Sequence, residues 1–141
     1  MKRILLSLAL TGACALAQAD IVVEDAYVRA PPPGGAAGSA YMKLRNTADA
    51  EVALVGAASN AAGKVTLHDT MDHGDMLHMM SISSLNVPAK GELLLKSGGA
   101  HLMLEELSAE LVPGSEVELS LQFSDGSTVS LQAPVRSVLD E

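Results

Sequence analysis

Histidine and methionine residues gather in one part of this sequence. Thioether sulfur is a soft, neutral donor that suits Cu(I), imidazole nitrogen binds both oxidation states of copper, and neither sulfur nor imidazole is the ligand that Mg, Ca or Mn prefers. All four histidines and five of the seven methionines lie between residues 68 and 103. The cluster therefore predicts a copper site. Its members are His68, Met71, His73, Met76, His78, Met79, Met80, His101 and Met103.

The first 19 residues are typical of an export signal. Lys2 and Arg3 form a basic start, residues 4–10 are apolar, and Ala17-Gln18-Ala19 is a small-x-small cleavage site. The apolar run is too short to cross a bilayer as a helix. We therefore expect residues 1–19 to be a signal peptide and residues 20–141 to be a periplasmic protein that has no stable insertion in a membrane.

The chain contains a single cysteine, Cys14, which lies inside this signal. A lipoprotein signal ending at Cys14 is an alternative, although Thr11 stands where such signals usually carry an apolar residue. After cleavage behind Ala19 the mature chain has no thiol. An oxidising compartment consumes exposed thiolates, so a soft-metal site there is better built from thioether and imidazole groups. The missing thiolate also excludes a blue-copper electron-transfer site.

Short runs of alternating apolar and polar residues follow the signal, and they predict β-strands separated by turn residues. Helical periodicity is weak. Many short strands at this spacing favour a single all-β domain, a Greek-key β-sandwich or barrel. Its core must be aliphatic, because the chain has no Trp and one Phe. The expected strands are residues 21–29, 40–46, 51–57, 64–68, 77–83, 92–96, 100–105, 116–123 and 128–135.

Two of these strands must position the metal donors. His101 and Met103 lie two residues apart in a predicted strand, and residues two apart project from the same face. Both side chains could therefore hold one ion while Leu102 and Leu104 point into the core. His68 ends another predicted strand, so two neighbouring strands and a hairpin could bring the donors together.

The methionines after residue 75 are less clear from the sequence. Alternation places Met80 on one face with His78 and sets Met79 on the other face, so periodicity does not choose between Met79 and Met80. His78 fits a ligand or a surface position equally well. Structural roles are expected for the remaining candidates: core filling for Met42, packing or loop contact for Met76 and Met80, and a solvated turn position for His73.

Charge and motifs exclude several classes of function. Without Lys2 and Arg3, seven of the nine basic residues remain against 17 acidic ones. This acidic balance makes nucleic acid and anionic membrane surfaces poor partners. The sequence also lacks a nucleophile with its base, a paired-carboxylate motif and a phosphate loop, so we do not expect an enzyme.

Four of the candidate donors follow a specific spacing. His68, ten residues, Met79, twenty-one residues, His101, one residue and Met103 match the pattern His-x10-Met-x21-His-x-Met without a gap. In this pattern the chain resembles the PCu(A)C family of periplasmic copper chaperones. Further stretches resemble the same family: residues 22–33 (VVEDAYVRAPPP), 40–46 (AYMKLRN), 99–105 (GAHLMLE) and 123–136 (FSDGSTVSLQAPVR).

The resemblance implies a cupredoxin-like fold and a Cu(I) site formed by His68, Met79, His101 and Met103, with Met79 preferred over Met80. It also implies delivery of copper to cytochrome c oxidase, at the binuclear copper centre of subunit II, together with a Sco-type thiol chaperone. A copper buffer or resistance protein without a dedicated recipient is the alternative. We further expect a monomer. A weaker accessory site for Cu(I) or Cu(II) could be formed by His73, Met76 and His78.

Overall fold

The structure is a computed structural model that describes residues 20–32, 35–73, 76–108 and 110–137, apart from the side chains of residues 70–79. These residues form strands and turns and no helix. The strands are β1 (Ile21–Arg29), β2 (Gly38–Asn46), β3 (Val52–Ser59), β4 (Ala62–His73), β5 (Met76–Ile82), β6 (Leu85–Val87), β7 (Glu92–Leu95), β8 (His101–Leu107), β9 (Glu116–Phe123) and β10 (Thr128–Arg136).

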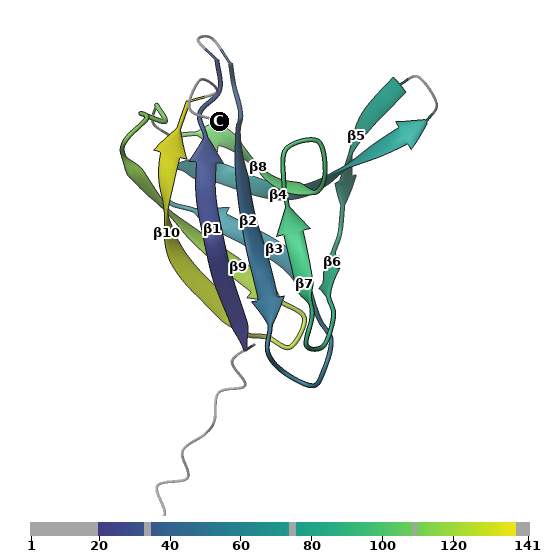
Figure 1. Cartoon of the computed structure of the whole chain (residues 1–141). Coiled ribbons are helices and arrows are strands. Elements are labelled where there is room, and N and C mark those ends of the chain that lie inside the picture. Colours follow the sequence, from purple (N-terminus) through teal and green to yellow (C-terminus); the bar gives the residue numbers. More distant parts are fainter. Residues whose placement is uncertain (1–19, 33–34, 74–75, 109, 138–141) are drawn as a thin grey trace, which may run out of the picture.

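Seven of the strands close into a barrel (Figure 1). Each strand in the order β4-β8-β2-β1-β10-β9-β3 is hydrogen-bonded to the next, and pairing between β3 and β4 closes the ring. The β1–β10 pair is parallel, and the other pairs are antiparallel. Closure leaves no open edge in the ring. The predicted all-β, cupredoxin-like fold is confirmed.

Alternation of side chains along the strands fills the interior of the barrel. In β9, Val117, Leu119, Leu121 and Phe123 are buried, while the residues between them are exposed or half-buried, as a period of two requires. The core is aliphatic apart from Phe123 and Tyr41, as expected. Met42 is 2% exposed within it, which confirms its role as a core residue.

Strands β7 and β8 share one neighbour. Leu95 in β7 lies opposite Met42 of β2, and Leu102 in β8 lies opposite Ala40 of the same strand. The chain between them leaves the sheet as a short loop and then returns. The Lys96 N–H donates to the Ala100 carbonyl at 2.9 Å and closes this loop. Gly98 lies within it at φ +82°, a conformation that glycine adopts without strain.

The strand bounds differ from the expected ones chiefly around the metal-donor segment. Strand β4 continues through residue 73 instead of ending at His68, because it pairs with β8 and then with β5. Figure 1 shows the β4–β5 hairpin extending away from the barrel. The three-residue strand β6 was not predicted, since Leu85–Val87 is too short to show alternation. Among the described residues no helix is long and apolar enough to cross a membrane, and the signal peptide expected at residues 1–19 lies outside them.

Candidate metal centre

His68 and His101 face each other across two adjacent strands. They are direct partners in the antiparallel β4–β8 ladder, and partners in such a ladder project from the same face of the sheet. Their rings stack with centroids 5.8 Å apart and an interplanar angle of 18°. The two predicted imidazole donors are therefore brought together.

Met103 joins the histidines on this face. It lies two residues after His101 and pairs with Thr66, which lies two residues before His68. The intervening residues Leu67 and Leu102 are buried in the core. The half-buried Met103 side chain is therefore on the outer face of β4 and β8, as the alternation of residues 101–104 predicted.

The pairing of β4 with β5 bears on the choice between Met79 and Met80. Met79 is the register partner of Thr70, two residues beyond His68, whereas Met80 is the partner of Asp69. Thr70 is two positions from His68 along β4 and Asp69 is one position from it, so alternation assigns position 70 to the face of His68 and position 69 to the opposite face. Met80 is 45% exposed. The side chain of Met79 lies outside the described residues, as do those of Met71, His73, Met76 and His78, so the accessory site stays a prediction.

The ring of His101 is held from two sides. Its Nδ1 lies 2.9 Å from the Gly99 carbonyl oxygen, and because a carbonyl only accepts, Nδ1–H is the donor. The ring is 5% exposed and lies 6.1 Å, centroid to centroid, from Tyr41. This arrangement leaves Nε2 as the nitrogen with a free lone pair, and a backbone carbonyl on the second nitrogen is a common partner of a metal-binding histidine.

The ring of His68 carries a nitrogen without a partner. Its Nε2 lies 2.8 Å from the Thr66 hydroxyl oxygen, while Nδ1 is buried and has no hydrogen-bond partner among the described side chains and backbone. Burial lowers the pKa of His68 below 6.5, and the neighbouring His101 and Lys64 lower it further, while Glu105 raises it in part. The ring is therefore neutral at pH 7, the form that can bind a metal.

The donor chemistry at this place is soft. Among the residues whose side chains are described, no group of three His, Cys, Asp or Glu converges on one point. Two imidazoles alone do not complete a tetrahedral or trigonal site, so further donors are needed. The thioether of Met103 lies on the same face, and thioether sulfur suits soft metal ions better than hard divalent cations.

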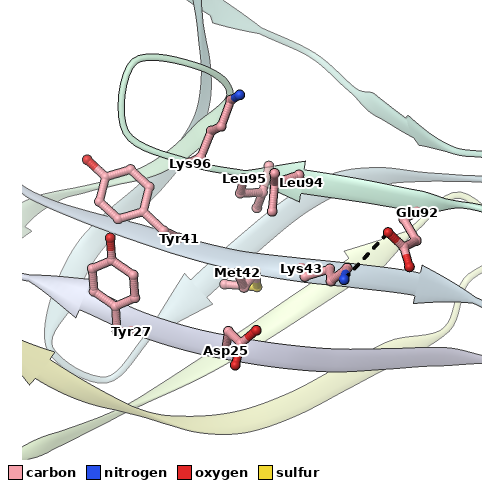
Figure 2. A pocket seen from close by; sticks show the side chains of 9 residues that line it. All are labelled: Asp25, Tyr27, Tyr41, Met42, Lys43, Glu92, Leu94, Leu95 and Lys96. Atoms are coloured by element: carbon pink, nitrogen blue, oxygen red, sulfur yellow. Dashed lines mark ion pairs between the residues drawn. The ribbon is translucent and has the colours of Figure 1, made fainter. Parts of the chain in front are cut away.

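A pocket of about 380 Å³ lies beside the histidine pair, on the outer surface of β1, β2 and β7 (Figure 2). Tyr41 links the two places, because its ring faces His101 and also lines the pocket. Lys43 in the pocket is paired with Glu92 at 3.6 Å. None of the pocket residues is a donor predicted from the His and Met spacing, so the pocket is a neighbour of the metal centre and not part of it. The residues that line the pocket are Asp25, Tyr27, Tyr41, Met42, Lys43, Glu92, Leu94, Leu95 and Lys96.

Comparison with known proteins identifies the family. The family model described as "Putative lipoprotein LpqE-like" matches residues 21–135. The chain belongs to the LpqE-like family. It is also 37% identical over 121 residues to the protein of Leifsonia xyli subsp. xyli (strain CTCB07) named "Putative lipoprotein Lxx21020", covering 84% of this chain and 72% of that protein.

Solved structures similar to this LpqE-like chain include copper-site domains. The copper-bound PCuAC domain from PmoF2 superposes with a TM-score of 0.69 at 25% identity, covering 86% of this chain and 96% of that one. The Cu(I) form of DR1885 from Deinococcus radiodurans superposes with a TM-score of 0.68 at 37% identity, covering 89% and 83%. Its apo form gives 0.64 at 34% identity, covering 88% and 83%. The family is described as a lipoprotein and the solved structures as copper-binding domains, in agreement with the prediction that this chain is not an enzyme.

Three residues at the site were not predicted from the sequence. Thr66 and Glu105 contact each other beside His68, and Tyr41 packs near His101. The signal for the first two was present, because Thr66 lies two residues before His68 and Glu105 lies two residues after Met103, so alternation puts them on the donor face. Tyr41 gave no such signal, because its place beside His101 depends on how β2 pairs with β8.

Proposed function

We propose that this LpqE-like chain is a copper carrier that binds one Cu(I) ion through His68, Met79, His101 and Met103. The observation that carries the proposal is the stacked histidine pair, in which a buried His68 nitrogen has no hydrogen-bond partner among the described residues. A buried acceptor without a partner costs free energy, about 1–3 kcal/mol, unless something binds it. Met103 on the same face, and the similarity to the Cu(I) form of DR1885, support copper as that ligand.

The donor set fits a carrier. Two imidazoles and two thioethers are neutral, so the bound ion keeps its single positive charge, and thioethers are weaker donors than thiolates. The ion can then be held by the carrier and still pass stepwise to the ligands of a recipient. Met79 is proposed over Met80 because alternation assigns its register partner Thr70 to the face of His68.

We propose that the chain is exported to the periplasm by residues 1–19. The lipoprotein name of the Leifsonia xyli relative supports export to the cell envelope, and it also gives weight to lipid attachment at Cys14. Incorporation of labelled palmitate into the wild-type chain, compared with Cys14→Ala, separates the two forms. Labelling that disappears in the variant would establish the lipid anchor and replace cleavage behind Ala19.

The proposed recipient is cytochrome c oxidase, at the binuclear copper centre of subunit II, with a Sco-type thiol chaperone as a co-worker. Deleting the gene should lower oxidase activity under copper limitation, and added copper should restore it. If oxidase activity is unchanged but tolerance to excess copper falls, the chain is a copper buffer or resistance protein that uses the same site.

Anaerobic Cu(I) titration of the mature chain tests the site itself. We expect one tight equivalent, weakened by His68→Ala and by Met79→Ala and nearly unchanged by Met80→Ala. Met80 is the matched control, because it is the same residue type one position along the same strand. Equal losses at Met79 and Met80 would contradict the proposed ligand set, and an intense visible band from the copper-loaded protein would instead indicate a blue-copper centre.

A further inference from the structure

The hydrogen bonds around His68 can be resolved by counting protons. The Thr66 hydroxyl lies 3.1 Å from Oε2 of Glu105 and 2.8 Å from Nε2 of His68. A carboxylate only accepts, so the single proton of the hydroxyl is donated to Glu105. The Thr66 oxygen must then accept from His68, which requires a proton on Nε2. Neutral His68 therefore keeps its lone pair on Nδ1, the nitrogen that is buried without a partner.

His101 has the opposite arrangement. Its Nδ1–H donates to the Gly99 carbonyl, so its lone pair is on Nε2. The two stacked rings thus present different nitrogens, although they are partners in the same ladder. For His101 the protonated nitrogen is fixed by a carbonyl that can only accept, and for His68 it is fixed by a hydroxyl whose own proton is donated to Glu105.

We propose that Thr66 and Glu105 are positioning residues that hold His68 as the Nε2–H tautomer, so that copper binds His68 through Nδ1 and His101 through Nε2. This inference rests on the proposed Cu(I) function. It names the coordinating nitrogen of each histidine and the two residues that fix the tautomer of His68. Partners of this kind orient the ring of a metal ligand, and their loss typically lowers metal affinity by about 10–100-fold.

The tautomer can be measured in the metal-free protein. ¹⁵N NMR of the histidine rings at a pH above 8 should show His68 with its proton on Nε2 and His101 with its proton on Nδ1. In Thr66→Val the preference of His68 should weaken or reverse, whereas Thr66→Ser should restore it. Thr128→Val, a hydroxyl removed from an exposed position in β10, is the matched control and should leave both rings unchanged. A wild-type His68 protonated on Nδ1 would overturn the proposal.

Ag(I), which resembles Cu(I) and has a magnetic nucleus, identifies the bound nitrogens directly. One-bond ¹⁵N–Ag splitting should appear on Nδ1 of His68 and on Nε2 of His101. Splitting on Nε2 of His68 would refute the atom assignment and leave the copper site intact. Absence of Ag(I) and Cu(I) binding would refute the proposed function instead, so the two failures are distinguishable.

Affinity measurements on variants test the positioning role. Thr66→Val should weaken Cu(I) binding by about 10–100-fold, and Thr66→Ser should retain it. Glu105→Gln should weaken binding as well, because an amide can donate to Thr66 and turn the hydroxyl proton toward His68. Glu118→Gln, which makes the same change of charge at an exposed position of β9, should not. Unchanged affinity and tautomer in both site variants would overturn the proposal.

Discussion

Asn46 and His101 are both buried polar residues. Asn46 ends β2, whereas His101 begins β8, which pairs with the other end of β2. Asn46 uses both ends of its amide: Nδ2 donates to the Ala50 carbonyl at 2.8 Å and to the Val87 carbonyl at 3.3 Å, and Oδ1 accepts from the Ala48 N–H at 3.0 Å. At the other end, the Nδ1–H of His101 is bonded to a carbonyl, and the neighbouring His68 has a buried nitrogen with no partner.

The difference separates a structural polar group from a binding one. Buried polar groups that serve only the fold are almost always fully hydrogen-bonded, because a missing partner costs free energy. Asn46 follows that rule and joins the loop after β2 and the last residue of β6 to the end of β2. The histidine pair does not follow it. We therefore expect substitution of Asn46 to lower the free energy of unfolding and substitution in the histidine pair to lower the affinity for Cu(I).

The largest effect is expected for His101→Ala. Loss of a direct ligand should lower Cu(I) affinity by more than the loss of up to roughly 100-fold that follows when a hydrogen-bond partner of a ligand is removed. Competition titration with a Cu(I) chelator measures the change, and thermal unfolding of the copper-free variant confirms that the chain is folded. An affinity within a few-fold of wild type would place the ion elsewhere and remove the contrast with Asn46.

Asn46→Ala should give the converse result. Three backbone groups lose their amide partner, and unfolding free energy should fall by about 2–3 kcal/mol, measured by urea denaturation of the copper-free chain. Cu(I) affinity at a temperature where the variant is folded should be unchanged. A matched loss of affinity would show that this end of the barrel is coupled to the metal centre.

A smaller effect is expected from pH. The pKa of His68 is lowered, mainly by burial, so Cu(I) affinity should be level from pH 8 to pH 7. It should begin to fall only below the free-histidine value of about 6.5, by at least about tenfold per pH unit once His68 takes up a proton. Affinity that is flat down to pH 5 would contradict a histidine-based site.

The same shift affects the metal-free protein. Between the lowered pKa of folded His68 and the value of about 6.5 in the unfolded chain, the unfolded state binds more protons than the folded state. The contribution of His68 to stability is therefore fully present above pH 6.5 and is lost as the pH falls through this window. Urea denaturation at several pH values, with His68→Gln as the control, measures the slope.

Much of the fold could be predicted from local sequence pattern. The expected strands 21–29 and 116–123 agree with the observed β1 and β9 at both ends. Residues 116–123 alternate clearly, and turn residues follow both segments. The length of β4 could not be predicted in this way. Its extension beyond His68 depends on the hairpin that β4 forms with β5, and residues 69–73 (DTMDH) do not alternate clearly between apolar and polar types.

The candidate site was predictable in part for the same reason. The shared face of His101 and Met103 follows from alternation alone, and their strand indeed turns Leu102 inward. Direct pairing of His68 with His101 requires the register between two strands more than thirty residues apart. The role of Thr66 could not be predicted from the sequence, because it depends on the position of the hydroxyl between the His68 ring and Glu105 in the folded chain.

The loop between β7 and β8 has a consequence for how this site could change. From Leu95 to Leu102 the chain advances by seven residues, while its partner β2 advances only from Met42 to Ala40. The extra residues form a loop that interrupts what would otherwise be one continuous strand beside β2. His101 is the residue at which the chain returns to the sheet. Insertions or deletions at this point could therefore re-aim the imidazole or remove its carbonyl partner without disturbing the barrel interior, which gives protein engineers a place to retune metal selectivity independently of folding.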